Sequence, residues 1–139
     1  AFLLRLFGAK IGKNVVIRPS VKITYPWKLT LGDYAWVGDD AVLYTLGEIT
    51  IGANSVVSQK CYLCTGSHDF MSQHFDITAS PVVIGEKCWL ATDVFVAPGV
   101  SVGDGTVVGA RSSVFKSLPA NKICRGNPAV VIRERVETD

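Results

Sequence analysis

The chain has 139 residues, of which 48% are hydrophobic and 19% charged, and its formal net charge is +2. This length and apolar content suit one globular domain over residues 1–139 and exclude a disordered chain. The small net charge gives no argument for a nucleic-acid or membrane-surface partner, and no apolar run approaches the ~20 residues of a membrane span.

The opening stretch AFLLRLFGAKIG is apolar but short, carries Arg5 and Lys10, and lacks the cleavage-site pattern of a signal peptide. The chain begins with Ala1 and not with Met, so we expect some native N-terminal residues to be missing. Four cysteines would suit disulfides, but nothing else in the sequence indicates secretion. We therefore expect a cytoplasmic protein.

An aliphatic residue recurs at every sixth position through most of the chain. These positions are Ile11, Ile17 and Ile23; Leu31, Val37 and Leu43; Ile51, Val57 and Leu63; and then, without a slip, Ile84, Leu90, Val96, Val102, Val108 and Val114. A period of six matches neither the 3.6-residue period of a helix nor the alternation of a strand. It indicates short strands joined by turns, with three hexads closing a triangular coil of about 18 residues.

Such a coil cannot bury its own aliphatic residues, so successive coils must stack. The stacking is expected to place Ile84 on Val102, Leu90 on Val108, and Val96 on Val114. Glycine, Asp and Asn follow many of the aliphatic positions and suit tight corners. We predict an all-β protein, a left-handed parallel β-helix of hexapeptide repeats. An irregular loop near residues 66–82 and a C-terminal capping segment complete it.

The cysteines follow the hexad pattern. Cys61, Cys88 and Cys124 fall on the fifth position, where the pattern places a small buried residue, and Cys64 falls on the second. The stretch CYLC also resembles half of a zinc site, but such a site needs two more ligands, and the chain has no second C-x-x-C and only two histidines. We predict structural cysteines and no metal.

The segment from Pro81 to Arg133 adds motifs that are more specific than the hexads. It contains WLA, which fits the pattern W-[IL]-x, and also APGV, VGDG, a lysine before LP, and GNPA. These motifs resemble those of the hexapeptide-repeat acyltransferases of the maltose and galactoside O-acetyltransferase group. Within that group, YLCTGSHDF is most similar to the acetyltransferases of bacterial exopolysaccharide, specifically colanic acid, biosynthesis. The resemblance implies a homotrimer with acetyl-CoA between neighbouring β-helices, so that two chains share each active site.

O-Acetyl transfer needs a base that takes the proton of an acceptor hydroxyl, and histidine suits this role because its ordinary pKa is about 6.5. The resemblance places the catalytic histidine at His68, in the irregular loop. The alternative interpretation is that His68 is a solvated loop histidine without a catalytic role. His74, in the same loop, is the second candidate for the base and a candidate acceptor contact. Asp69 either orients an imidazole or caps the loop.

Eight residues match the family's cofactor positions: Trp89, Ala91, Thr92, Ala110, Arg111, Phe115, Lys116 and Arg133. The backbone at Ala91 and Thr92 is a candidate oxyanion donor, Lys116 and Arg133 would face the CoA phosphates, and Trp89 would line the cofactor groove or pack at a trimer contact. Arg111 stands where the family has a small residue.

Two further departures concern the cofactor side. Phe115 replaces a threonine, and Val130 replaces a basic residue that the family often has.

The acceptor side departs further from the family. Gly38 stands near the place of an acceptor-binding asparagine, and Asp39, Asp40 and Tyr44 are candidate sugar contacts. Gly-Asp-Asp is also what a β-helix corner looks like. We expect an acetyl-CoA-dependent O-acetyltransferase that acts on a sugar hydroxyl in exopolysaccharide assembly by direct transfer. N-acetylation of an amino sugar and a non-catalytic scaffold are the alternatives, whereas a carbonic-anhydrase-like protein would need three histidines.

Overall fold

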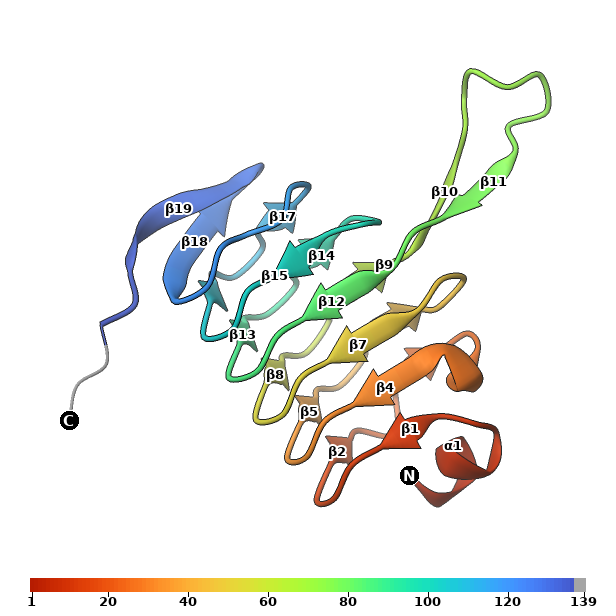
Figure 1. Ribbon diagram of the computed structural model, residues 1–139, viewed down its shortest axis with the longest axis horizontal. Helices are drawn as coiled ribbons and strands as arrows, with labels where there is room; N and C mark the ends of the chain where they lie inside the picture. Colours follow the sequence, from red (N-terminus) through yellow and green to blue (C-terminus); the bar gives the residue numbers. More distant parts are fainter. Residues whose placement is uncertain (137–139) are drawn as a thin grey trace.

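The computed structural model describes residues 1–136 and shows a left-handed parallel β-helix (Figure 1). The chain winds through three parallel sheets in turn, which we call sheets A, B and C. We name each corner by the sheets it joins, so that the chain passes an A–B, a B–C and a C–A corner in every coil. The prediction of this fold is confirmed.

Each sheet takes one short strand from each coil. Sheet A contains β1 (Lys10–Ile11), β4 (Leu29–Leu31), β7 (Ile49–Ile51), β12 (Val82–Ile84) and β15 (Ser101–Val102). Sheet B contains β2 (Val16–Ile17), β5 (Trp36–Val37), β8 (Val56–Val57), β13 (Trp89–Leu90), β16 (Val107–Val108), β18 (Lys122–Gly126) and β19 (Ala129–Glu134). Sheet C contains β3 (Lys22–Ile23), β6 (Val42–Tyr44), β9 (Tyr62–Cys64), β14 (Phe95–Val96) and β17 (Ser113–Val114).

The aliphatic hexad positions stack as the period predicts. Strand pairing joins Ile84 to Val102, Leu90 to Val108, and Val96 to Val114. From the second coil onward, the side chains in these columns are at most 2% exposed. The core is therefore a continuous apolar column, and each coil buries its triangle of side chains against the next coil.

All variation in coil length falls at the C–A corner. In sheet A, Ile11 pairs with Leu31, whereas Ile51 pairs with the much more distant Ile84. The extra residues form the short helix η1 (Pro26–Lys28) in the first coil and a long excursion, residues 65–81, in the third, and the second coil is lengthened by two residues. The other two corners keep the hexad spacing, so the stack stays in register despite these insertions.

The stretch expected to be an irregular loop contains a two-stranded antiparallel ribbon. Strands β10 (Gly66–His68) and β11 (Ile77–Ala79) pair so that His68 lies opposite Ile77. Figure 1 shows this hairpin projecting from the body of the solenoid.

The C-terminal segment closes one end of the solenoid. Strand β18 extends sheet B, and β19 folds back along it. The final C–A corner is short, since Leu118 bridges to Val102 at the position where a full coil of three hexads would place Ala120. For this reason Cys124 pairs with Val108 and takes an aliphatic column position, so its assignment to the fifth hexad position is wrong. Residues 137–139 of the expected capping segment lie outside the described residues.

The opposite end carries the helix α1 (Phe2–Leu6), which lies beside β1. Within residues 1–136, no helix is long and apolar enough to cross a membrane.

Candidate active site

His68 ends strand β10, where the ribbon passes into the loop of the hairpin, and is exposed. Its ring atom Nδ1 lies 2.8 Å from the backbone carbonyl oxygen of Phe75. A carbonyl can only accept a hydrogen bond, so in the neutral ring Nδ1 carries the proton and donates it. This tautomer leaves Nε2 with a lone pair, which is the form that a general base requires.

The backbone on the other side of the hairpin supplies this carbonyl. Phe75 has φ = 48°, a left-handed conformation that non-glycine residues adopt rarely, and Ser72 stabilises the turn by accepting the Asp76 N–H through its hydroxyl at 2.8 Å. The turn thus directs the Phe75 carbonyl at the imidazole of His68.

Asp69 caps the hairpin loop and does not orient His68. Its carboxylate accepts the Met71 N–H at 3.0 Å, and its backbone N–H donates to the Asp76 carbonyl at 2.8 Å. Of the two alternatives that the sequence left open, the structure therefore supports the cap. His74 lies in the exposed turn of the hairpin, beyond the ribbon.

A cavity of about 270 Å³ opens where the hairpin leaves sheet C. Its lining comes from the ribbon of the hairpin and from the ends of β6 and β9: Tyr44, Leu46, Tyr62, Cys64, Gly66, Ser67, His68 and Ile77. The structure thus brings Tyr44, a predicted acceptor contact, into one cavity with His68. Burial raises the pKa of Tyr62 above its ordinary value of about 10, and a phenol is in either case protonated near neutral pH and able to donate a hydrogen bond.

An aromatic ladder crosses the outside of sheet C from this cavity. Tyr44, Tyr62, Phe95 and Phe115 follow one another with ring centroids 6.4, 5.9 and 6.0 Å apart. The ladder ends at Phe115, and the next residue, Lys116, is exposed at the C–A corner. His68 and Lys116 therefore both lie on the C–A edge of the solenoid, on different coils.

The predicted oxyanion donors lie on the B–C corner. The Ala91 N–H donates to the Val108 carbonyl at 3.0 Å, so it belongs to the strand ladder. For the Thr92 N–H, no hydrogen-bond partner is found within residues 1–136, while its hydroxyl donates to the Gln59 carbonyl at 3.2 Å. Of the two amides, the Thr92 N–H is the one left for a ligand.

Ala110 and Arg111 lie one coil further along the same corner. Arg111 adopts φ = 60° and donates its backbone N–H to the Thr92 carbonyl at 2.8 Å. Its guanidinium is exposed and lies 3.9 Å from the Asp93 carboxylate, too far for a hydrogen bond. The side chain at this unusual position thus points into solvent, and the exposed Ala110 beside it leaves the backbone accessible.

The other predicted cofactor residues lie on or beside sheet B. Trp89 is half-exposed on β13, and its indole N–H donates to the Ser58 hydroxyl at 3.0 Å. Arg133 is exposed on β19, opposite Ile123 of β18.

Asp39 and Asp40 form the B–C corner of the second coil. Asp39 makes an ion pair with Arg18 at 3.1 Å, and Asp40 has φ = 61° with its N–H bonded to the Ser20 hydroxyl. Both residues serve the corner geometry, and neither lines the cavity beside His68.

Sequence reasoning missed the Phe75 carbonyl and Tyr62. A backbone carbonyl leaves no residue-type signal, and no pattern within the hairpin indicated its turn. Tyr62 carried a weaker signal: it lies 18 residues after Tyr44, close to the spacing of one coil, although the strand register pairs Tyr44 with Cys64.

Three of the four cysteines, Cys61, Cys88 and Cys124, are buried in the core, and burial raises the pKa of each thiol. For Cys61 the pKa rises to about 11. All four cysteines are free thiols. Within the described residues, no group of three His, Cys, Asp or Glu side chains is placed to hold a metal ion.

The predicted residues gather at two different corners of the triangular coil. His68, Phe115 and Lys116 follow strands of sheet C, whereas Thr92 and Ala110 follow strands of sheet B. One chain therefore holds the candidate base and the candidate oxyanion donor on opposite edges of sheet C.

A repeating hexad solenoid with these motifs defines a hexapeptide-repeat transferase. Residues 81–116 match the family model described as bacterial transferase hexapeptide (six repeats). Over its whole length the chain is 88% identical to the "Putative colanic acid biosynthesis acetyltransferase WcaF" of Escherichia coli (strain K12), and it spans 76% of that protein. The chain therefore belongs to the hexapeptide-repeat acetyltransferases.

Solved structures agree with this assignment. A maltose O-acetyltransferase from Clostridium difficile 630 superimposes with a TM-score of 0.92 at 28% identity, over 98% of this chain and 74% of that one. A galactoside acetyltransferase in complex with coenzyme A superimposes with a TM-score of 0.91 at 27% identity, over 97% of this chain and 69% of that one.

Proposed function

We propose that this enzyme is an O-acetyltransferase that transfers the acetyl group of acetyl-CoA to a sugar hydroxyl in exopolysaccharide assembly, with His68 as general base. The single observation that carries the proposal is the hydrogen bond from His68 Nδ1 to the Phe75 carbonyl, which presents Nε2 as a base beside a cavity. The relative named for colanic acid biosynthesis supports the polysaccharide acceptor, and the solved complex with coenzyme A supports the donor.

In this mechanism His68 Nε2 takes the proton of the acceptor hydroxyl as the oxygen attacks the thioester carbonyl. The Thr92 N–H stabilises the resulting oxyanion. The carbon–sulfur bond then breaks, and the imidazolium returns its proton to the departing thiolate.

Transfer is direct in this proposal, because Cys61, Cys88 and Cys124 are buried in the core and do not line the cavity beside His68. Cys64 does line the cavity, and its thiol donates to the Gly66 carbonyl at 3.1 Å.

The proposed site is shared by two chains of a homotrimer. Support comes from the separation of His68 and Thr92, which lie at different corners of one solenoid and meet only if a second solenoid packs alongside. In a cyclic trimer, such a contact between neighbouring chains occurs three times, and the third contact completes the ring. Lys116 and Arg133 would bind the CoA phosphates. The pantetheine arm would pass along Trp89, Ala110 and Phe115. Residues 1–139 would act as a single cytoplasmic domain.

On the acceptor side, Tyr44 is the contact that the cavity favours. Asp39, Asp40 and His74 remain weaker proposals, since none of the three lines the cavity. N-Acetylation of an amino sugar uses the same machinery and is the alternative reaction. The acceptor panel that follows the binding experiment should therefore contain both sugar hydroxyls and amino sugars.

The test is a calorimetric titration of acetyl-CoA into the protein after light scattering has established its mass. Saturable binding near one equivalent per chain, weakened about tenfold or more by Lys116→Ala, supports the proposal. Lys87→Ala is the matched control, because Lys87 is an exposed corner lysine on the A–B corner. A folded trimer that does not bind acetyl-CoA would favour the non-catalytic scaffold.

A further inference from the structure

A small cavity lies on sheet B, close to the B–C edge of the second and third coils. It has a volume of about 60 Å³ and is lined by Trp36, Gly38, Val56, Val57, Ser58 and Gln59. None of these six residues carries a charged side chain, whereas a hydroxyl and an amide lie beside apolar surface. Such a lining suits a neutral polar ligand, because a few polar groups fix the orientation of a ligand that apolar groups cover.

Two exposed indoles lie on the same face of sheet B. Val56 pairs with Trp36 on one side and with Trp89 on the other, so the two tryptophans are two strands, or about 9–10 Å, apart at the backbone. Trp36 is 48% exposed and Trp89 is 50% exposed. The electron-rich face of an indole attracts C–H groups that carry a partial positive charge, and one face of a pyranose ring presents several of them. Trp36, which lines the cavity, is therefore a platform for a sugar ring.

The hydroxyl of Ser58 is oriented by Trp89. The Trp89 indole N–H donates to Ser58 Oγ at 3.0 Å. The oxygen is the acceptor in this bond, so the Ser58 proton is left to be donated, and no acceptor for it is found within residues 1–136. Ser58 thus offers a ligand one hydrogen-bond donor, whose direction depends on Trp89.

The size of the cavity limits the ligand group that enters it. The volume admits a few water-sized groups, which is enough for the hydroxymethyl group of a sugar and too little for its ring. A Cβ built at Gly38 would lie 2.7 Å from the Gln59 backbone nitrogen, so a larger residue there would disturb the lining. The geometry therefore suits a ring that lies on Trp36 and directs one exocyclic group inward.

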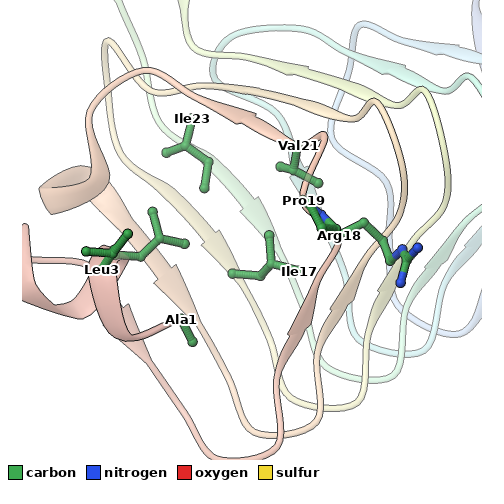
Figure 2. A pocket seen from close by; sticks show the side chains of 8 residues that line it. Ala1, Leu3, Ile17, Arg18, Pro19, Val21 and Ile23 are labelled. Carbon is green, nitrogen blue, oxygen red and sulfur yellow. The ribbon is translucent and has the colours of Figure 1, made fainter.

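The larger cavity beside α1 lacks this combination of groups. It has a volume of about 390 Å³, and Figure 2 shows the apolar side chains of Leu3, Ile17 and Ile23 around it, while the Arg18 side chain extends away from them. Its lining contains no hydroxyl or amide side chain. Size alone therefore does not make a sugar site, and the small cavity on sheet B carries the inference.

This small cavity lies beside the proposed reaction centre and outside the proposed donor path. In the proposed function, the donor extends along the fifth and fourth coils, past Ala110 to the Thr92 N–H. The Thr92 hydroxyl donates to the Gln59 carbonyl at 3.2 Å, so the lining of the cavity begins one coil before the proposed oxyanion donor. The second and third coils are thus the part of the B–C edge that the donor leaves open.

The cavity beside His68 is also lined by the second and third coils, but at the C–A edge. In a cyclic trimer whose axis runs along the solenoids, equal coils lie at equal height, so the two cavities face one groove from neighbouring chains. The cavity beside His68, at about 270 Å³, is the larger of the two and is the place for the sugar that is acetylated. The platform at Trp36 is then left for another sugar of the same glycan.

We propose that Trp36, Gly38 and Ser58 form a second acceptor subsite, which binds a neutral sugar residue next to the one that is acetylated. The inference rests on the proposed function, and it narrows the acceptor to a glycan of more than one sugar. The ring packs on Trp36, its exocyclic group enters the cavity, and the Ser58 O–H donates to one of its oxygens. Trp89 acts through Ser58 and is a positioning residue for this subsite.

The test compares how tightly the protein binds two kinds of sugar, measured by saturation-transfer NMR. One is an oligosaccharide made by partial hydrolysis of colanic acid after alkali has removed its acetyl esters, and the other is a pair of single sugars, the methyl glycosides of glucose and galactose. We expect the oligosaccharide to bind more tightly. Trp36→Ala should weaken its binding about five- to tenfold and change that of the single sugars by less than about twofold.

The matched control is Trp27→Ala, which removes another exposed tryptophan that lines neither cavity. This variant should bind the oligosaccharide as the wild type does. Calorimetry should give Trp36→Ala an unchanged affinity for acetyl-CoA, which establishes that the variant is folded and that its loss concerns the acceptor alone.

A second set of variants tests the positioning role of Trp89. Ser58→Ala and Trp89→Phe should each weaken oligosaccharide binding about threefold, and the double variant should bind no more weakly than the single ones, because both changes remove the same hydrogen bond. Ser58→Thr keeps a hydroxyl and should retain wild-type affinity. Ser101→Ala, on the exposed face of sheet A, is the matched control. Additive losses in the double variant would show that Trp89 does not act through Ser58.

Three results would overturn the subsite. They are equal affinity of the wild type for the oligosaccharide and the single sugars, unchanged oligosaccharide binding by Trp36→Ala, and light scattering that shows Trp36→Ala separating the assembled chains, because Trp36 would then be a subunit contact. Failure of the proposed function would be distinguishable from these, since it would appear as a wild-type protein that binds no acetyl-CoA.

Discussion

The imidazole of His68 and the carbonyl of Phe75 face each other across the hairpin at 2.8 Å. The intervening positions fold back on themselves through the Asp69 cap, so one short segment carries both the candidate base and the group that fixes its tautomer. These hydrogen bonds lie within the hairpin, and because they involve His68 and not His74, they predict that the two histidines of this hairpin behave differently.

Replacement of His68 by Gln should lower kcat by about 10²- to 10⁴-fold, because a general base of this kind contributes that much to the rate. The affinity for acetyl-CoA should stay near that of the wild type. His74→Gln removes the other histidine of the same hairpin and should change kcat less than about threefold. Steady-state kinetics with the identified acceptor check both values, and equal losses in the two variants would rule out the assignment of the base to His68.

Two inactive variants should restore activity when their subunits are mixed. His68→Ala removes the proposed base, and Ala110→Trp should block the cofactor path at the B–C corner. In a random cyclic assembly of equal amounts, about one quarter of shared sites combine an intact His68 with an intact Ala110 from the neighbouring chain. The activity of a mixture that has been unfolded and refolded together, compared with that of separately refolded variants, measures this recovery. No recovery would show that one chain supplies the whole site.

Stability should fall in alkaline solution in a way that depends on Cys61. Burial raises the pKa of this thiol to about 11 in the folded protein, whereas an unfolded cysteine ionises near ~8.5. The folded state therefore holds the proton more tightly, and its advantage, complete below the unfolded pKa, is lost as pH rises toward 11.

The measurement is urea unfolding of the wild type and of Cys61→Ala at neutral pH and near pH ~9.5. The free energy of unfolding of the wild type should drop by about 1 kcal/mol more than that of the variant over this interval. An identical pH dependence in both proteins would contradict the assignment.

The corners of the solenoid should differ sharply in their tolerance of a methyl group. A Cβ added at Gly103 would lie 2.5 Å from the Ala120 backbone nitrogen, whereas one at Gly47 would lie 3.4 Å from its nearest neighbours. Gly103→Ala should therefore lower the free energy of unfolding by about 1–3 kcal/mol, and Gly47→Ala by less than about 0.5 kcal/mol. Thermal unfolding of both variants compares them, and a tolerated Gly103→Ala would mean that the coils are able to separate locally.

Most of the fold could be predicted from the sequence, because each hexad carries its own signal and the stacking follows from burial of the aliphatic columns. The partners of Ile84, Leu90 and Val96 follow directly from a coil of three hexads. Cys124 was placed wrongly because the last corner is shorter, and a deletion at a corner leaves the hexads on either side unchanged.

The candidate site was less accessible to sequence reasoning. Residue type and resemblance predicted His68, but the distribution of the predicted residues over two corners required the strand order. The difference between the Ala91 and Thr92 amides also required the structure, because ladder hydrogen bonds depend on register and not on side chains. Backbone groups such as the Phe75 carbonyl have no signature in composition.

The C–A corner absorbs every change in coil length, from the short helix η1 to the whole hairpin, while the strands on either side keep their partners. The segment that carries His68 is therefore able to change in length or sequence without changing the pairing of the strands on either side. The segment that carries the proposed base thus lies outside the strands that form the core, whereas the proposed acceptor contact Tyr44 belongs to β6 of the solenoid. New specificities would be expected to arise as insertions at this one corner, and the hairpin is a natural site for grafting the corresponding segments of related enzymes.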